Sequence, residues 1–287
     1  MVYHINRGEL AQREGGPLPC LSVLTDDCIA RGRDITDGGV VYNYHSICFI
    51  GTATTADALQ ALKKFVFEDK SVGANEILDA LRSNWQNQEP LRQKMLLQAP
   101  KYGNDLPEVD SIAARVASDF IQLMDQMRSP LNGRYFVHLF SFVWHLDFGR
   151  LIGATPDGRK ASEPLAYSLA AQQGRDERGI TALLSSISRL PHRQAAGATA
   201  AIVEIDPVMV AGENGQARMS QLIMTAMRMG VGQLQWNVVT AERLIKAQAD
   251  PERYGNIPVR VAGYSQMFKL VDKPLQDHII ARTKHRS

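Results

Sequence analysis

The chain has 287 residues, of which 45% are hydrophobic and 22% are charged, and its formal net charge is +2. This composition is typical of a globular protein with a buried core and excludes a disordered or fibrous chain. Because the charge is nearly balanced and the sequence has no long run of Lys and Arg, we expect neither nucleic acids nor acidic membranes as partners.

The apolar segments of the sequence are too short or too interrupted to cross a membrane, since a spanning helix needs about 20 apolar residues. The stretch from Phe136 to Trp144, for example, is broken by His138 and Ser141. The N-terminal residues contain no apolar core of the signal-peptide type. We therefore expect a cytoplasmic protein with no membrane partner.

The cysteines and histidines do not form a recognisable site. Cys20, Cys28 and Cys48 have spacings that fit neither a zinc site nor a disulfide framework, and we interpret them as reduced thiols with structural roles. His138 and His145 would share one helical face, but no third ligand accompanies them. No metal site is therefore predicted.

The first part of the chain is predicted to be irregular and then helical. Residues 1–40 are rich in Gly, Pro and Asp, so only short buried pieces are expected, at 21–24 and 28–30. A strong helix is predicted at 55–67. Its expected N-cap is Thr54 or Thr55, and its expected apolar face consists of Leu59, Leu62 and Val66.

Three further amphipathic helices are predicted, at 74–85, 89–98 and 107–127, the last with Pro107 in its first turn. The aromatic and branched residues at 134–143 favour a buried strand, followed by a helix at 144–152. The sequence is then rich in turn-forming residues and irregular until about residue 179. We place the main internal boundary in this region.

Helices and strands alternate in the last third of the chain. They are predicted as a helix at 219–229, a strand at 233–239, a helix at 241–249, a strand at 257–262 and a helix from Pro274 that ends among Arg282, Lys284 and His285. This alternation predicts an α/β architecture with parallel strands joined by helices.

The most informative segment is the strand that breaks at Gly263, followed by a polar loop and a helix. A lone glycine here has a structural explanation, because glycine ends strands where the backbone needs a positive φ or approaches another segment closely. The longer string from 257 to 283, however, resembles the C-terminal glycyl radical motif of the pyruvate formate-lyase and glycerol or diol dehydratase family. The residues shared with the motif are Arg-Val-Ala-Gly-Tyr, then a Phe, then Gln-Asp, two Ile and Arg-Thr.

The resemblance extends upstream in the same order along the chain, from about residue 20 to the end. Residues 234–239 are similar to the buried strand that precedes the glycine loop in the family. The other similar segments are 32–39, 56–59, 101–105 and 154–159. The segment from Gly197 to Pro207 follows the family pattern less clearly.

The resemblance implies a fold and a site. Residues 1–165 would form the C-terminal part of a ten-stranded α/β barrel of the glycyl radical enzyme type, and residues 166–287 the glycine radical domain. Gly263 would carry the radical, with Arg260 and Tyr264 supporting the glycine loop. In this family a separate iron–sulfur activating enzyme uses S-adenosylmethionine to remove a hydrogen from the glycine. We therefore expect this activating enzyme as a partner and no cofactor bound to the chain itself.

Glycine suits this role for a physical reason. Removing a hydrogen from its Cα leaves an unpaired electron shared between the adjacent amide nitrogen and carbonyl, and this sharing requires a planar centre with no side chain to clash. The loop must also move out to be loaded and return to protect the radical.

The family's catalytic cysteine is not recognisable in the sequence. It is preceded by Gly and followed two positions later by Glu in the dehydratases, or forms a Cys-Cys pair in pyruvate formate-lyase. Cys20, Cys28 and Cys48 stand in neither context. We interpret the chain as starting downstream of the cysteine loop, so that part of the barrel would be absent and apolar surface would be left for a partner to cover.

Three hypotheses follow from the sequence. The leading one is a C-terminal segment of a glycyl radical lyase, closer to the dehydratases, that works with a complementing N-terminal chain. The second is a spare radical domain that repairs a full-length homologue, which would need little beyond residues 166–287. The third is an inactive, truncated remnant.

Overall fold

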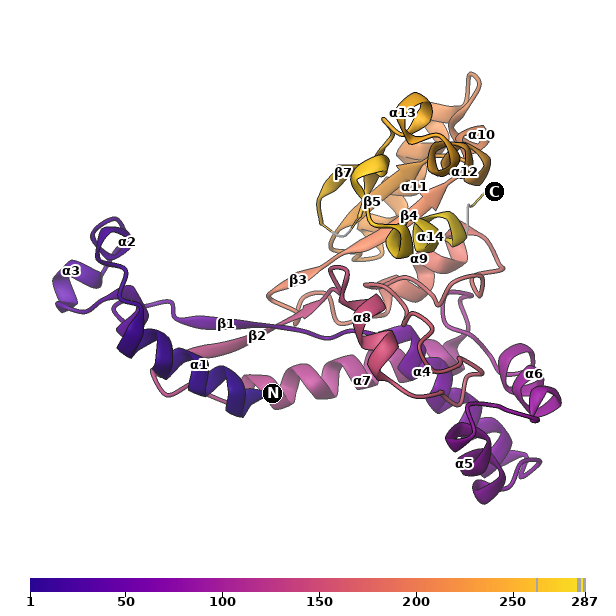
Figure 1. Ribbon diagram of the computed structural model, residues 1–287, viewed down its shortest axis with the longest axis horizontal. Coiled ribbons are helices and arrows are strands. Elements are labelled where there is room, and N and C mark those ends of the chain that lie inside the picture. Colours follow the sequence, from indigo (N-terminus) through magenta and orange to yellow (C-terminus); the bar gives the residue numbers. More distant parts are fainter. Residues whose placement is uncertain (262, 283–284, 286–287) are drawn as a thin grey trace.

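The computed structural model describes residues 1–261, 263–282 and 285. Ala262, the expected end of the last long strand, lies outside the described residues, as do Thr283 and Lys284. An arm, a central group of parallel strands and an upper lobe make up the molecule (Figure 1). In the part that the structure describes, no helix has the length and apolar character needed to cross a membrane.

The N-terminal arm is helical, which the sequence did not predict. It comprises α1 (Val2–Gly15), α2 (Pro19–Val23), α3 (Cys28–Arg31) and the 3₁₀ turn η1 (Ile35–Asp37). Contacts distant in the sequence hold α1 in place: the buried Glu9 carboxylate accepts hydrogen bonds from the Ser129 hydroxyl at 2.7 Å and the Leu131 N–H at 3.0 Å. Helix α1 therefore depends on tertiary contacts rather than on a strong apolar stripe.

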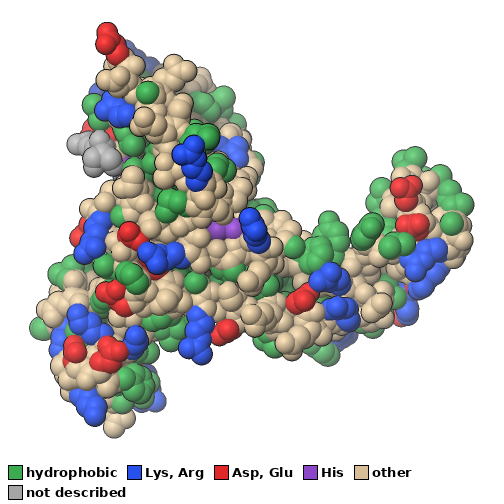
Figure 2. Space-filling view, turned by 180° about the vertical axis from the view of Figure 1, so that it is seen from behind, with side chains coloured by type: hydrophobic (Ala, Val, Ile, Leu, Met, Phe, Trp, Pro, Cys, Tyr) green, Lys and Arg blue, Asp and Glu red, His purple; other side chains and the backbone are tan. Residues whose placement is uncertain are grey.

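The apolar side chains at the end of the arm are exposed, so the expected buried pieces at 21–24 and 28–30 are wrong. Leu21, Leu24 and Ile29 are 47%, 84% and 70% exposed, and of the expected positions only Ser22 and Cys28 are buried. Figure 2 shows hydrophobic side chains gathered on this outlying end of the molecule.

Three parallel strands lie at the centre, in the order β1 (Tyr44–Cys48), β2 (Arg134–Leu139) and β3 (Ala198–Thr199). The connection from β1 to β2 contains α4 (Thr52–Leu62) and α7 (Pro107–Asp125), which pack against each other. The sequence did not predict β1. Strand β2 ends before the predicted residue 143 because the chain turns at Phe142, whose φ is +46°.

The predicted helix at 55–67 is present, but its cap and its buried face differ from the prediction. Its N-cap is Gly51, with a φ of +81°, rather than Thr54 or Thr55. Leu59 is 41% exposed, whereas Leu62 and Val66 are partly buried as predicted. The fully buried positions of α4 include the small residues Ala53, Ala56 and Ala61. Small side chains allow α4 and α7 to approach closely, which a search for large apolar residues misses.

A small helical lobe follows α4. It contains the π-helix η2 (Lys63–Glu68), α5 (Ala74–Arg82) and α6 (Glu89–Leu97), around a core that includes Phe65 and Trp85. These helices and α8 (Trp144–Leu151) confirm the sequence predictions.

The upper lobe contains the rest of the chain. Its elements are α9 (Ile180–Ser188), β4 (Ala201–Ile205), α10 (Pro207–Val210), α11 (Gly215–Arg228), β5 (Leu234–Val238), α12 (Ala241–Ala249), α13 (Pro251–Tyr254), β6 (Pro258–Arg260), β7 (Ser265–Met267), η3 (Phe268–Leu270) and α14 (Lys273–Ala281). Strands β4 and β5 are parallel, whereas β6 and β7 are antiparallel. The sequence did not predict α9 and β4.

Parallel strands linked by helices confirm the α/β class. Only Ala200 separates β3 from β4, so one extended segment links the two parallel sheets. Among the described strands, the sheets contain three, two and two strands, and no closed ten-stranded barrel is formed.

Candidate functional site

The glycine singled out in the sequence lies at the tip of a hairpin made by β6 and β7, here called the glycine hairpin (residues 258–267). The N–H of Val261 donates a hydrogen bond to the carbonyl oxygen of Tyr264 at 2.9 Å. This bond closes the turn that contains Gly263.

The backbone requires glycine at position 263 for two reasons. Its φ is +83°, which side-chain-bearing residues rarely adopt, and a Cβ there would lie 3.0 Å from Cζ of Phe140. The Phe140 ring is itself braced by Phe142, with ring centroids 4.4 Å apart. The sequence did not single out Phe140, because it directly follows β2 and meets the hairpin only through the tertiary fold.

The two residues expected to support the loop have different surroundings. Arg260 spans the hairpin: its Nε donates to Oε1 of Gln235 at 3.2 Å, and its Nη1 donates to Oγ of Ser265 at 3.1 Å. Tyr264 has a 49% exposed side chain, and its main-chain carbonyl makes the turn bond described above. Their supporting roles stay predictions.

A buried ion pair lies beneath the strand that enters the loop. Nη1 of Arg282 donates to Oε1 of Glu204 at 2.8 Å, and the two side chains are 0% and 1% exposed. The same guanidinium makes longer contacts, of 3.4 and 3.5 Å, to the carbonyl oxygens of Arg260 and Val261. Arg282 belongs to the motif quoted from the sequence, but neither it nor Glu204 was predicted as a site residue.

Aromatic rings and imidazoles pack behind Arg282. Its guanidinium lies 4.3 Å from the ring centroid of Tyr167, and the rings of His145 and His278 are 4.4 Å apart. Burial, and secondarily the charge of Arg282, lowers the pKa of His145 to about 3, so its imidazole is neutral at physiological pH. This is the environment of a packed core histidine.

The prediction that His138 and His145 share a helical face is wrong. His138 lies on β2 and His145 on α8, so the turn after Leu139 separates them. Over residues 1–261, 263–282 and 285, no group of three His, Cys, Asp or Glu side chains is placed to hold a metal ion.

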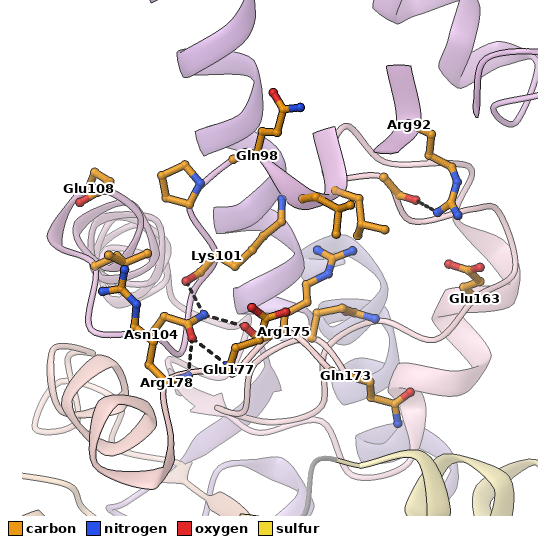
Figure 3. Close-up of a pocket in the computed structure, with 18 of the residues that line it drawn as sticks. Arg92, Gln98, Lys101, Asn104, Glu108, Glu163, Gln173, Arg175, Glu177 and Arg178 are labelled. Atoms are coloured by element: carbon orange, nitrogen blue, oxygen red, sulfur yellow. Dashed lines mark hydrogen bonds between the residues drawn. The ribbon is translucent and has the colours of Figure 1, made fainter. Parts of the chain in front are cut away.

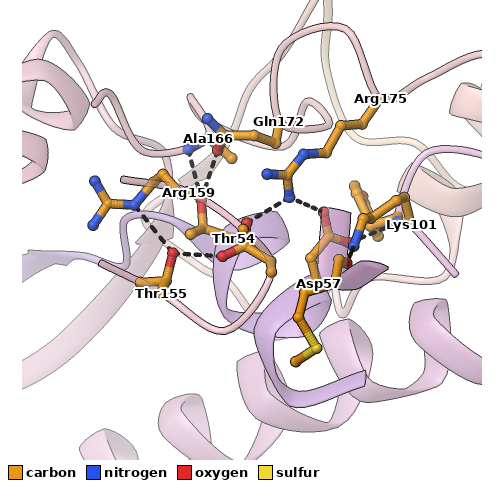
Figure 4. Close-up of polar contacts among 12 residues, drawn as sticks. Thr54, Asp57, Lys101, Thr155, Arg159, Ala166, Gln172 and Arg175 are labelled. Carbon is orange, nitrogen blue, oxygen red and sulfur yellow. Dashed lines mark hydrogen bonds and ion pairs between the residues drawn. The ribbon is translucent and has the colours of Figure 1, made fainter. Parts of the chain in front are cut away.

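Three of the other segments that resemble the family, 56–59, 101–105 and 154–159, meet at Arg175 (Figure 4). Its Nη1 contacts Oδ2 of Asp57 on α4 at 3.0 Å and also Oδ2 of Asp157. Oδ1 of Asp57 accepts a hydrogen bond from the N–H of Tyr102 at 2.8 Å. Asp57, Lys101, Asp157 and Arg175 form a buried group that we call the Arg175 clamp.

The charges of the clamp influence one another. Burial raises the pKa of Asp57 to about 6, although Arg175 and Lys101 attract its carboxylate. Burial likewise lowers the pKa of Lys101 to about 8. The clamp therefore keeps ionisable groups in an environment that disfavours their charges.

Side chains near the clamp fix the segment 166–178 to the first part of the chain. Asn104 donates to the carbonyl oxygen of Arg175 at 2.6 Å and accepts from the N–H groups of Glu177 and Arg178 at 2.8 and 3.1 Å. The hydroxyl of Thr54 accepts from the N–H of Ala166 at 2.9 Å. These bonds join the sequence regions on either side of the predicted boundary.

An open cleft of about 770 Å³ borders the clamp, lined by cationic and anionic side chains including Arg92, Lys101, Arg178, Glu108 and Glu163 (Figure 3). Nη1 of Arg92 is occupied by the carbonyl oxygen of Gly158 at 2.8 Å. None of the residues that line the cleft belongs to the glycine hairpin, which lies in the upper lobe (Figure 1). The cleft is therefore not the environment of Gly263.

All three cysteines are free thiols. Cys20 is exposed on α2, Cys28 is buried on α3, and Cys48 ends β1. Burial raises the pKa of Cys48, which disfavours its thiolate.

Comparison with known protein families gives two matches. The family profile described as "Pyruvate formate lyase-like" matches residues 1–149, and the profile described as "Glycine radical" matches residues 165–269, which include Gly263.

Individual proteins show the same similarity. The probable dehydratase YbiW of Escherichia coli (strain K12) is 36% identical over 273 residues, covering 92% of this chain and 34% of that protein. The trans-4-hydroxy-L-proline dehydratase of Clostridioides difficile is 33% identical over 268 residues, covering 93% and 34%. The glycerol-bound B12-independent glycerol dehydratase from Clostridium butyricum superposes with a TM-score of 0.93 at 36% identity, covering 97% and 35%. The chain thus spans about a third of the length of these proteins.

Proposed function

Because the chain belongs to the pyruvate formate lyase-like family of glycyl radical enzymes, we propose that Gly263 stores the backbone radical of a dehydratase or lyase of this family. The observation that carries the proposal is the place of Gly263 at the tip of a closed hairpin inside the region that matches the glycine radical profile. The proposed reaction class follows the relatives, which are named as dehydratases and lyases.

The environment of Gly263 suits both loading and storage. The hairpin tip is exposed, so a radical-activating enzyme that uses S-adenosylmethionine can reach the Cα hydrogen. The close approach of Phe140 and the positive φ disfavour a side chain at position 263, which suits a planar radical centre. The hydrogen bond from Val261 to Tyr264 fixes the turn between activation events.

We further propose that the attacking cysteine comes from a complementing chain or segment, because none of the three cysteines stands in a family-type context. Exposed apolar side chains on the hairpin, and on the segment after Phe140, support a partner at this face. They are Phe142, Trp144, Tyr264 and Met267, which are 43%, 51%, 49% and 42% exposed.

The Arg175 clamp argues against a spare domain that needs little beyond residues 166–287. The partners of Arg175 lie on α4 and in the segment 154–159, and Asn104 braces the same loop. A radical domain that docks on its own would have to hold the segment 166–178 without upstream residues. Here that segment depends on buried charges from those residues.

The test is anaerobic activation with a family activating enzyme, reductant and S-adenosylmethionine, followed by electron paramagnetic resonance. We expect a glycyl doublet in the wild type and none in Gly263→Ala. Gly230→Ala is the matched control, because Gly230 also has a positive φ, of +92°, but no atom within 4 Å of its would-be Cβ. It should keep the doublet. Absence of a doublet in the wild type, with activation shown to work on a complete family member, would refute radical storage and favour the remnant.

A further inference from the structure

Asn237 on β5 pairs with the main chain of Arg260 through its side chain. The N–H of Arg260 donates to Oδ1 of Asn237 at 2.6 Å, and Nδ2 of Asn237 donates back to the carbonyl oxygen of Arg260 at 3.1 Å. One carboxamide thus occupies both hydrogen-bonding groups of this residue, as a neighbouring strand would. Asn237 is 3% exposed, so water does not compete for these bonds.

Glu204 fixes the orientation of this carboxamide. Glu204 and Asn237 are register partners across β4 and β5, and Oε1 of Glu204 accepts from Nδ2 of Asn237 at 2.8 Å. Because a carboxylate accepts and does not donate, the amide nitrogen must face Glu204 and the amide oxygen must face the N–H of Arg260. Arg282 completes the arrangement through its 2.8 Å bond to the same oxygen.

The attachment of the hairpin is therefore concentrated on the strand that enters the loop. Asn237 and Arg282 contact the main chain of Arg260 and Val261, immediately before the radical position. On the exit side, Ser265 accepts a hydrogen bond from the Arg260 side chain, which lies within the hairpin itself, and the main chain is next held after β7, where Gln276 donates to the carbonyl oxygen of Phe268 at 2.9 Å. Movement of the tip then depends on how firmly the main chain at Arg260 is held.

We propose that Asn237 is a positioning residue that holds the Arg260 peptide and thereby sets how often Gly263 leaves its place against Phe140. Glu204 acts through it by fixing its amide, and Arg282 both holds Glu204 and contacts the carbonyl oxygens of Arg260 and Val261 directly. The inference rests on the proposed storage of the radical at Gly263. It assigns the control of loop opening to β5 rather than to the side chains of Arg260 and Tyr264.

Hydrogen exchange of the purified chain tests this without any radical. Two variants separate hydrogen bonding from packing: Asn237→Leu keeps the branched shape and still fills the site but loses both bonds to Arg260, whereas Asn237→Ser is too short to make them and leaves the site underfilled. We expect exchange of residues 257–267 to become at least about tenfold faster in both variants. Exchange in α7 and the thermal midpoint should change little.

The matched control is Asn104→Leu, because Asn104 is also a buried Asn, 6% exposed, that braces a main-chain segment. It should loosen the segment 175–178 and leave the hairpin unchanged. A positioning role also predicts faster loading and earlier loss of the radical in Asn237→Leu.

Three results would overturn the proposal: unchanged hairpin exchange in Asn237→Leu, acceleration in Asn237→Ser alone, or loss of the folded state in both variants. The second would mean that packing holds the loop, and the third that Asn237 supports the whole fold. The absence of a doublet in the wild type would instead refute radical storage, while the exchange result would still stand.

Discussion

The Arg175 clamp and the glycine hairpin are both held by buried polar groups, but they differ in what surrounds them. Asp57 and Asp157 are 0% exposed and come from segments distant in sequence, so the carboxylates of the clamp are fully buried, although Lys101 and Arg175 border the cleft. The tip of the hairpin at Gly263 is exposed, and the hydrogen bonds that attach the hairpin to β5 are concentrated at Arg260. Opening the clamp requires local unfolding, whereas the tip can move at the cost of a few hydrogen bonds. A loop on which an activating enzyme must place a radical needs an attachment of the hairpin type, which opens without unfolding.

Removal of the clamp cation is expected to have the largest effect on stability. Arg175→Met leaves two buried carboxylates without their shared partner and should lower the free energy of unfolding by about 3–5 kcal/mol. Arg260→Met, in the hairpin, removes two partly exposed hydrogen bonds and should cost about 1 kcal/mol. Urea unfolding monitored by circular dichroism measures both.

Arg178→Met serves as the control for Arg175→Met, because Arg178 lines the same cleft but is exposed. It should change the free energy of unfolding by less than about 0.5 kcal/mol. Equal losses in Arg175→Met and Arg260→Met would show that the clamp is no firmer than the hairpin, and the contrast between them would fail.

The pH dependence of stability should also distinguish the clamp. The folded-state pKa of Asp57 is about 6, against an ordinary value of 3.8, so the folded state binds this proton more tightly than the unfolded state. The resulting stabilisation is complete below about pH 4 and is lost as the pH rises through about 6. Relative to Asp57→Asn, the wild type should lose up to about 3 kcal/mol over this interval.

This difference is obtained from urea unfolding of both proteins at several pH values. A difference that stays constant between pH 4 and pH 7 would show that Asp57 remains ionised in the folded state. The attraction of Arg175 and Lys101 would then outweigh the effect of burial.

Two glycine substitutions compare the regions directly. Gly103→Ala combines a φ of +95° with a Cβ 2.7 Å from Cβ of Ala171, in a packed core, and should cost about 2–3 kcal/mol. Gly263→Ala has a similar φ but faces one ring edge at an exposed tip, and should cost about 1 kcal/mol. Thermal unfolding of both variants, with Gly230→Ala as the strain-only control, checks the order.

The sequence predicted the helices best where an apolar stripe or a proline marks them, as in α7 and α14. It did not predict α1, because the bonds from Ser129 and Leu131 to Glu9 hold that helix through residues far away along the chain. It did not predict β4, because this strand is short and fully buried. Without polar alternation, its periodicity does not distinguish a strand from a piece of buried helix.

The candidate site was predicted only in part. Gly263 was identified because its motif is continuous in the sequence. Phe140, Glu204 and Asn237 were not, because they meet the hairpin from the end of β2, from β4 and from β5, and no spacing along the chain shows which strands will be neighbours. The segments 56–59, 101–105 and 154–159 each resemble the family separately in the sequence, and only the fold shows that their charged residues meet at Arg175.

The smallest expected effect is that of Tyr264→Ala, which tests whether the tip of the hairpin contributes to the fold at all. Its side chain is 49% exposed, and the turn bond uses its main-chain carbonyl, which alanine keeps. The free energy of unfolding should therefore change by less than about 0.5 kcal/mol. A loss well above this value would place the ring in the packing of the hairpin and weaken the contrast with the clamp. An unchanged stability together with a smaller glycyl doublet would instead mean that the Tyr264 ring contacts the activating enzyme, because a partner can bind only to exposed side chains.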